Sequence, residues 1–282
     1  MLDIEFSKME GLGNDFIVID GRKIDLEGVD LAQISIKLCD RHFGIGADGL
    51  ILILPSKKAN AKMRIFNPDG SEPEMCGNGI RCAAKLIYER SEPKKEILSV
   101  ETLAGIMLPS ILEHRGRSAI VEVDMGIPVL ERSKIPMKGK DQPKVIGEDL
   151  KINGETFKVT CVSMGNPHCV IFVNDLNVTD VGKWGPQIEN NSVFPKRTNV
   201  EFAQITGKEA VSVKVWERGA GETLACGTGA CAALVAGVLN NKLSRKVTIS
   251  LPGGNLECEW TENDHVLMRG PAVTVFEGKM TI

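Results

Sequence analysis

Two cysteine-containing turns are the stretches of this chain best suited to chemistry. The first reads Met75-Cys76-Gly77-Asn78-Gly79 and the second reads Ala225-Cys226-Gly227-Thr228-Gly229, with the second cysteine 150 residues after the first. Each turn runs into an alanine-rich segment with the pattern of a helix. A turn that opens a helix presents backbone N–H groups with no acceptor inside the helix, and such groups bind anions. A cysteine there lies at the positive end of the helix dipole, which favours the thiolate.

Paired thiols of this kind can invert a carbon centre. If Cys76 and Cys226 face opposite sides of one carbon, a thiolate removes its proton and the other thiol delivers a new one. An ordinary thiol pKa of about 8.5 needs only modest lowering for this work near neutrality. Helix N-termini aimed at a neighbouring carboxylate would stabilise the carbanion that forms.

The alternative for any single cysteine is an inert buried thiol. Repetition of the whole Cys-Gly-x-Gly-helix unit favours a function for Cys76 and Cys226. The other six cysteines lack such a turn and are expected to be core or surface thiols: Cys39, Cys82, Cys161, Cys169, Cys231 and Cys258. No C-x-x-C pair occurs, so a structural zinc site is not expected, and no metal ligand set is predicted.

Polar residues near the two turns are the candidates for tuning the thiols and binding a substrate. His168 and Glu217 are predicted to tune the thiols, although a lone histidine is more often structural. Asparagines at strand ends usually serve turns, but several in one site would bind the ammonium and carboxylate groups of an amino acid. Arg218 is either a bidentate carboxylate ligand or a solvated surface residue. The candidate asparagines are Asn14, Asn67, Asn166 and Asn199.

Composition places the chain among ordinary soluble globular proteins. It has 282 residues, 43% apolar and 25% charged, which is enough for two modest domains. The net charge of −3 and the absence of long Lys/Arg runs argue against nucleic-acid binding. No secretory signal is evident, and the longest apolar run, 230–239, is too short to span a bilayer. We therefore expect a cytoplasmic protein with reduced thiols and no membrane partner.

The periodicity predicts helices over 30–38, 76–89 and, more weakly, 181–188, with a fourth from Cys226. In the second of these, Arg81, Lys85 and Glu89 share one stripe and are predicted to face solvent, while the helix after Cys226 is apolar all round and predicted to be buried. The formal G-x-G-x-x-G at 44–49 follows a helix and enters a strand, so a dinucleotide site is rejected. Strands are predicted over 4–8, 16–20, 50–54, 63–66, 97–102, 105–112, 118–124, 158–163, 169–173, 199–205, 211–216, 247–251, 256–260, 266–268 and 273–276.

The two halves of the chain match beyond the cysteines. Gly13-Asn14 corresponds to Gly165-Asn166, and 64–67 corresponds to 214–217. A repeat of this length is too long for a solenoid unit and indicates duplicated domains. We expect an N-terminal domain over 1–124 with Cys76, to which 271–282 returns, and a C-terminal domain over 125–270 with Cys226.

These motifs resemble the diaminopimelate epimerase family. The matching segments span the chain: 8–16, 66–71, 75–82, 164–168 and 217–229, the last containing Glu-Arg-Gly-Ala-Gly-Glu-Thr. The resemblance implies an α+β fold of two pseudo-symmetric domains, each a mostly antiparallel sheet curled around a central helix, with the active site in the cleft between them. It also implies a homodimer that interconverts LL- and meso-diaminopimelate without pyridoxal phosphate or metal, in lysine and cell-wall precursor biosynthesis.

Carried over by position, the resemblance makes Cys76 and Cys226 the acid/base pair and His168 and Glu217 the residues that tune them. It implies that the substrate is bound by Asn14, Asn67, Gly77, Asn78, Asn166, Asn199, Glu217, Arg218, Gly227 and Thr228. Some members have Gln in place of Gly49, so no contact is assigned there. Two alternatives remain: a proline or hydroxyproline racemase, which also pairs cysteines, and a non-catalytic amino-acid-binding or redox protein.

Overall fold

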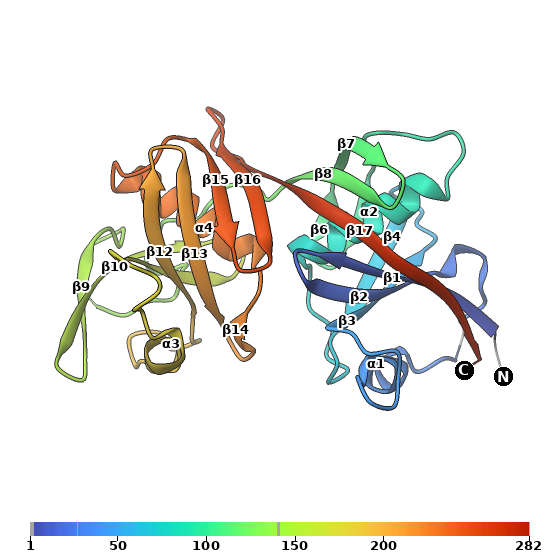
Figure 1. The fold of residues 1–282 in the computed structure, drawn as a ribbon, viewed down its shortest axis with the longest axis horizontal. Helices are drawn as coiled ribbons and strands as arrows, with labels where there is room; N and C mark the ends of the chain where they lie inside the picture. The colour runs from blue at the N-terminus through green and yellow to red at the C-terminus, as the bar shows by residue number, and fades with distance from the viewer. Residues whose placement is uncertain (1–2, 27, 140–141, 282) are drawn as a thin grey trace. The chain divides into compact units, whose positions relative to one another are not determined.

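The chain forms two compact units in a computed structural model that describes residues 3–26, 28–139 and 142–281. The first unit comprises residues 1–124 with 269–282, and the second comprises residues 125–268. Each unit contains a mixed, strand-rich sheet and two α-helices (Figure 1). This α+β class agrees with the expectation from the sequence.

The first unit holds the elements before residue 125 and most of the last strand. Its elements are β1 (Asp3–Gly11), β2 (Asn14–Asp20), the 3₁₀ turn η1 (Gly21–Lys23), α1 (Leu31–Cys39), β3 (Gly49–Leu54), β4 (Ala61–Phe66), α2 (Gly77–Glu89), β5 (Val100–Thr102), β6 (Gly105–Met107), β7 (Ser110–Arg115), β8 (Ser118–Asp124) and the greater part of β17 (Val266–Thr281). The Asp30 carboxylate caps α1 by accepting the Gln33 N–H, as the sequence predicts.

The second unit repeats this order. Its elements are β9 (Glu148–Ile152), β10 (Glu155–Ser163), β11 (Pro167–Phe172), α3 (Val181–Glu189), β12 (Asn199–Gly207), β13 (Ala210–Glu217), β14 (Gly221–Thr223), α4 (Gly227–Leu239), β15 (Lys246–Leu251), β16 (Gly254–Trp260) and the start of β17. The sequence pattern missed β9, whose Glu-Asp-Leu-Lys-Ile run buries only Leu150 and Ile152.

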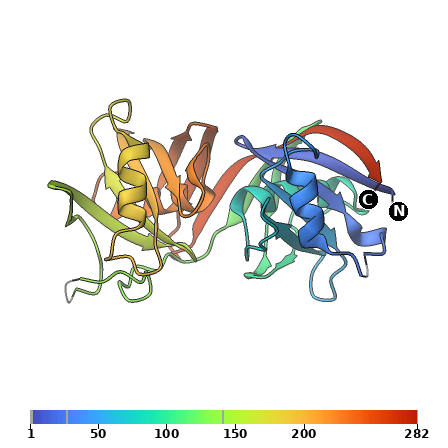
Figure 2. The same ribbon diagram turned by 90° about the horizontal axis from the view of Figure 1, so that it is seen from below.

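Each sheet curls around one helix and carries a second helix on its outer face. In the first unit α2 packs against β1, β2, β3, β4, β7 and β8, and in the second α4 packs against β10, β11, β12, β13, β15 and β16. The outer helices α1 and α3 cover the other face (Figure 2). Strands such as β3 and β11 are therefore buried on both faces, which explains their continuous apolar runs.

The strand registers confirm the internal repeat. The parallel pair of β2 and β3 sets Phe16 beside Gly49, and the parallel pair of β11 and β12 sets His168 beside Asn199. A further match joins each cysteine turn to its sheet, because Ala104 N–H donates to the Glu74 carbonyl and Gly253 N–H donates to the Leu224 carbonyl. Asn14, the first residue of β2, and Asn166, which directly precedes β11, consequently occupy equivalent positions.

The predicted wet stripe of α2 is wrong at two of its three positions. Arg81 and Lys85 are fully buried, because β17 covers this face of the helix. The Arg81 guanidinium donates to the Pro271 and Gly77 carbonyls, and the Lys85 ammonium donates to Glu89 and to the Thr274 hydroxyl. The charged side chains of Arg81 and Lys85 thus face β17, which supplies oxygen atoms that accept their hydrogen bonds.

Two further expectations changed in detail. The weakly predicted helix over 181–188 is α3, in which Gly185 is required because an added Cβ would lie 2.4 Å from the Trp216 ring. The two strands expected over 266–268 and 273–276 are one continuous strand, β17. The rejected G-x-G-x-x-G lies between α1 and β3, in the reversed order that the sequence predicted.

Candidate active site

Cys76 is the N-cap of α2. Its backbone is extended, with φ −135° and ψ 122°, and its Sγ accepts the Gly79 N–H at 3.4 Å. The side chain is partly exposed, whereas the other seven cysteines are buried. The first N–H groups of the helix, those of Gly77 and Asn78, cannot be satisfied within the helix. This turn therefore combines an accessible thiol with donors suited to an anion.

An amide network surrounds Cys76. The Sγ lies 3.9 Å from the Asn14 Oδ1, which also accepts from the Asn78 Nδ2 at 3.1 Å. The Asn14 Nδ2 donates to Asp48 at 2.9 Å, and Asp48 also accepts the Asp15 N–H at 3.1 Å. Asn14, Asn78 and Cys76 are therefore brought together as predicted, and Asp48 fixes the orientation of the Asn14 amide.

Asn67 differs from the other candidate asparagines because its side-chain amide is hydrogen-bonded within its own turn. Its amide donates to the Ser71 hydroxyl at 2.9 Å, and its N–H donates to the Ser71 carbonyl at 2.8 Å. These contacts close the turn 67–71 at the end of β4. Asn67 thus has the turn role common for asparagine, and a substrate contact for it stays a prediction.

Cys226 is the N-cap of α4 and repeats the backbone of Cys76. Its φ is −123° and its ψ is 113°, and its Sγ accepts the Gly229 N–H at 3.4 Å. This thiol is only 6% exposed. Burial, followed by the nearby carboxylates of Glu217 and Glu201, raises the pKa of Cys226 well above its ordinary value. The Thr228 hydroxyl, 3.5 Å from the Sγ, and the Gly229 N–H act in the opposite direction.

A chain of side-chain hydrogen bonds leads from Cys226 into the core. The Asn166 Nδ2 donates to the Thr228 Oγ1 at 3.3 Å, and the Asn166 Oδ1 lies 2.9 Å from the His168 Nε2. The His168 Nδ1 lies 2.7 Å from the Glu201 Oε1, and neither of these two side chains is exposed. Burial raises the pKa of Glu201, and the neighbouring His168 opposes that shift. His168 therefore contacts Cys226 only through Asn166 and Thr228.

The turn that carries Glu217 and Arg218 is anchored by two buried residues. The Asn199 Oδ1 accepts the Arg218 N–H at 2.9 Å, while the Asn199 Nδ2 donates to the Pro167 carbonyl at 2.9 Å. The buried Glu189 accepts the Gly219 N–H at 2.9 Å. Glu217 accepts from the Thr223 hydroxyl at 2.5 Å. Arg218 is exposed, and its guanidinium donates to the Lys196 carbonyl at 3.2 Å.

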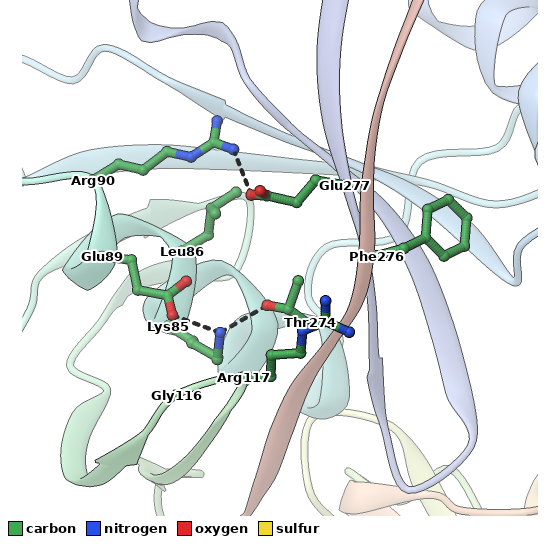
Figure 3. A pocket seen from close by; sticks show the side chains of 9 residues that line it. All are labelled: Lys85, Leu86, Glu89, Arg90, Gly116, Arg117, Thr274, Phe276 and Glu277. Carbon is green, nitrogen blue, oxygen red and sulfur yellow. Dashed lines mark hydrogen bonds and ion pairs between the residues drawn. The ribbon is translucent and has the colours of Figure 1, made fainter.

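A separate cavity of about 650 Å³ opens in the first unit, away from the predicted site residues. It is lined by Lys85, Leu86, Glu89, Arg90, Gly116, Arg117, Thr274, Phe276 and Glu277. Figure 3 shows that Lys85 is bound to Glu89 and Thr274, and that Arg90 is bound to Glu277. Because two of its three cations are already paired with carboxylates, this cavity gives no reason to relocate the site from the cysteine turns.

The described residues can also be compared with the requirements for holding a metal ion and for crossing a membrane. Within them, no cluster of three or more His, Cys, Asp or Glu side chains could hold a metal ion. None of the helices in the described ranges combines the length and apolarity needed to cross a membrane.

Comparison with known proteins identifies the family. The sequence profile described as diaminopimelate epimerase matches residues 6–131 and 160–275. Diaminopimelate epimerases from Pelotomaculum thermopropionicum and Moorella thermoacetica are each 56% identical to this chain over 276 residues, covering 98% of both partners in each comparison. The enzyme from Methanococcus maripaludis is 48% identical over 280 residues, covering 99% of this chain and all of its own.

The chain belongs to the diaminopimelate epimerase family.

Solved structures show the same fold at low sequence identity. A phenazine biosynthesis protein of the PhzF family from Bacillus anthracis matches with a TM-score of 0.71 and 17% identity, covering both chains completely. A hydroxyproline epimerase from Agrobacterium vitis, with bound trans-4-hydroxy-L-proline, matches with a TM-score of 0.67 and 15% identity, covering 99% of this chain and 92% of its own. At these identities the likeness concerns the fold alone.

Sequence reasoning missed three acidic residues that hold the site of this family member in place: Asp48, Glu189 and Glu201. Glu201 left a signal, since it is the single charge within the apolar strand run Asn199-Val200-Glu201-Phe202-Ala203. A charge in such a strand requires a buried partner. Asp48 and Glu189 lie at element ends, where an acid is ordinary, so the pattern alone gave no reason to single them out.

Proposed function

We propose that this chain is a cofactor-independent epimerase that interconverts LL- and meso-diaminopimelate, with Cys76 and Cys226 as its acid/base pair. The observation that carries the proposal is the repeated cysteine turn, in which a thiol caps a helix next to asparagine side chains in both units. Family membership supplies the substrate.

The proposed reaction moves one proton off the α carbon and another onto it. One cysteine, as thiolate, takes the α proton and becomes a thiol, and the electron pair of the C–H bond stays on carbon. The other cysteine, a thiol, delivers its proton to the opposite face and becomes a thiolate. The negative charge that develops beside the substrate carboxylate would be stabilised by N–H groups at the starts of α2 and α4.

The contrast between the two thiols suggests a resting state. Because the pKa of Cys226 is raised, it would rest as the thiol, and the exposed Cys76 would supply the thiolate. The substrate would be held by Asn14, Asn67, Gly77, Asn78, Asn166, Asn199, Glu217, Arg218, Gly227 and Thr228. The assignment also includes tuning of the thiols by Glu217 and His168, a homodimeric state, a cytoplasmic location and a place in lysine and cell-wall precursor biosynthesis.

Labelling from D₂O tests this mechanism. During a short incubation with LL-diaminopimelate, the delivered proton should come from a thiol that has exchanged with solvent. The meso product should therefore carry deuterium at the inverted carbon, while recovered LL substrate carries almost none. Equal early labelling of the meso product and the recovered LL substrate would contradict the two-base mechanism. Labelling of proline instead of diaminopimelate would favour a proline racemase.

A further inference from the structure

The hydrogen-bond chain behind Cys226 passes through Asn166, whose amide sets the direction of the two links on either side of it. Asn166 is the informative member, because an amide oxygen only accepts and an amide nitrogen only donates. Its Oδ1 faces the His168 Nε2 at 2.9 Å, so this ring nitrogen must carry a hydrogen and donate it. Its Nδ2 donates to the Thr228 Oγ1 at 3.3 Å.

The last link joins Thr228 to the thiol. The Thr228 hydroxyl can donate while its oxygen accepts from Asn166, and it lies 3.5 Å from the Cys226 Sγ, where either atom could be the donor. A hydroxyl that donates to sulfur stabilises the thiolate over the thiol. The same Sγ also accepts the Gly229 N–H. If Thr228 donates, two donors converge on Sγ and oppose the burial and the Glu217 and Glu201 carboxylates, which favour the thiol.

Glu201 explains how His168 keeps its Nε2 hydrogen. The Glu201 Oε1 lies 2.7 Å from the His168 Nδ1, and both side chains are fully buried. The proton between them can reside on either atom, giving an ion pair or two neutral groups, and in both forms Nε2–H remains a donor. Glu201 Oε2 has no hydrogen-bond partner among the described residues, which favours a shared proton over a bare carboxylate.

The packing leaves little freedom for this pair. A Cβ added at Gly229 would lie 2.8 Å from the Glu201 Oε1, so the carboxyl group sits directly against the first turn of α4. An acid at a helix N-terminus is electrostatically favourable. Glu201 thus touches both the helix that carries Cys226 and the histidine that begins the chain of donors.

We propose that Glu201 is a positioning residue, which retains a proton on the His168 pair and thereby directs the Thr228 hydroxyl to donate to Cys226 Sγ. The sequence of donors is His168 Nε2–H to Asn166 Oδ1, Asn166 Nδ2–H to Thr228 Oγ1, and Thr228 O–H to Cys226 Sγ. In the alternative arrangement, the Thr228 oxygen accepts from the Cys226 thiol as well as from Asn166, and Sγ then has one donor instead of two.

Nitrogen NMR of the labelled histidines tests the first step. The chain has four histidines, and the His168→Gln variant assigns the His168 signals. We expect Nε2 to carry its hydrogen in the native chain. An unprotonated Nε2 with a protonated Nδ1 would overturn the proposal. In Glu201→Leu, Nε2 should become partly unprotonated, while Glu201→Gln, whose amide can donate to Nδ1, should keep it protonated. If Glu201→Leu retains the native signals, Glu201 has no part in the chain.

Alkylation tests the last step without requiring turnover. Iodoacetamide modification of Cys226 is followed by peptide mass spectrometry, with Cys76 in the same chain as the internal reference. Thr228→Val removes the donor, so the Cys226 rate at pH 8 should fall about tenfold relative to Cys76, the size expected for a hydrogen bond to a charged group. Thr228→Ser should restore most of that loss. An unchanged or faster Cys226 rate in Thr228→Val would mean that Thr228 accepts from the thiol, and would overturn the proposal.

The inference rests on the proposed function only in taking Cys226 as an acid/base group. Both measurements are made on the resting protein without substrate. A chain that fails to epimerise diaminopimelate could still show this donor direction, and an active epimerase could show the reverse. The two proposals therefore fail separately.

Discussion

The turns at Cys76 and Cys226 have nearly the same backbone conformation, but their sulfur atoms differ in exposure and in neighbouring side chains. Both cysteines are extended N-caps whose sulfur accepts the N–H three residues later at 3.4 Å. Cys76 is partly exposed and faces the Asn14 oxygen, whereas Cys226 is buried near Glu217, Glu201 and a threonine hydroxyl. A duplicated turn can therefore keep the same geometry at both sulfurs while their neighbours differ, and the surroundings of Cys226 raise its pKa.

The helices that follow these turns differ in the same way. α2 buries two cations, Arg81 and Lys85, at positions equivalent to Cys231 and Val235 in α4. Both helices are wrapped by a sheet, and the buried cations of α2 donate to the Pro271 carbonyl and the Thr274 hydroxyl of β17. The fold thus tolerates a charged or an apolar central helix, provided that the covering strand supplies matching partners.

The largest expected effect is on catalysis, for which both cysteine turns should be required equally. Cys76→Ala and Cys226→Ala should each reduce kcat for diaminopimelate epimerisation by roughly 10³-fold or more, because inversion needs a proton donor and an acceptor on opposite faces. The double variant should be little worse than either single one. Cys231→Ala, in the buried part of α4, is the matched control and should retain activity. Near-native turnover in either single variant would contradict the two-thiol assignment.

The charged helix can be tested by removing one partner at a time. Glu89→Leu leaves the buried Lys85 ammonium with only Thr274, and should lower the free energy of unfolding by about 3 kcal/mol. Lys85→Met should lower the free energy of unfolding far less, because the partly exposed Glu89 carboxylate can be hydrated by water. Val235→Lys in α4 is the reciprocal control and should destabilise at least as much as Glu89→Leu. Denaturant unfolding gives all three values, and equal losses from Glu89→Leu and Lys85→Met would argue against a buried charge.

Differential alkylation sharpens the contrast between the thiols. At pH 7.5, iodoacetamide should modify Cys76 at least tenfold faster than Cys226, because Cys226 is buried and its raised pKa keeps it protonated. Glu217→Gln removes one of the carboxylates that raise this pKa. The variant should therefore increase the alkylation rate of Cys226 alone and reduce the difference between the rates of the two thiols. Equal alkylation rates for both thiols in the native chain would show that their different surroundings do not change their reactivity.

The smallest expected effect is on stability at alkaline pH. The raised pKa of folded Cys226 means that its thiol ionises first in the unfolded chain. The contribution of the neutral thiol is fully present below the unfolded pKa, near 9.0, and is lost as pH rises toward the folded pKa. Between pH 8 and pH 10 the native chain should therefore lose about 1 kcal/mol more stability than Cys226→Ser. Parallel pH profiles of the two proteins would contradict a raised pKa for Cys226.

Local patterns in the sequence determined much of this protein. The Cys-Gly-x-Gly turns, the Asp30 cap, the buried helix after Cys226 and the internal repeat follow from spacing and residue type, because turns, caps and amphipathic faces are set by neighbours in the chain. The family motifs depend on the same short segments. Pattern reasoning therefore singled out both cysteines, Asn14, which lies 3.9 Å from the Cys76 Sγ, and Asn166, which donates to Thr228.

Tertiary structure decided which polar residues are buried and what they touch. The spacing of Arg81 and Lys85 predicts a solvent face, but β17, nearly 200 residues later in the chain, supplies the Pro271 carbonyl and the Thr274 hydroxyl that make their burial possible. Likewise, the parallel pairing of β11 with β12 brings Glu201 to His168 across 33 residues. Hydrogen-bond partners at such separations leave no periodic signal, so the different environments of two near-identical cysteine turns emerge only when the strands are paired.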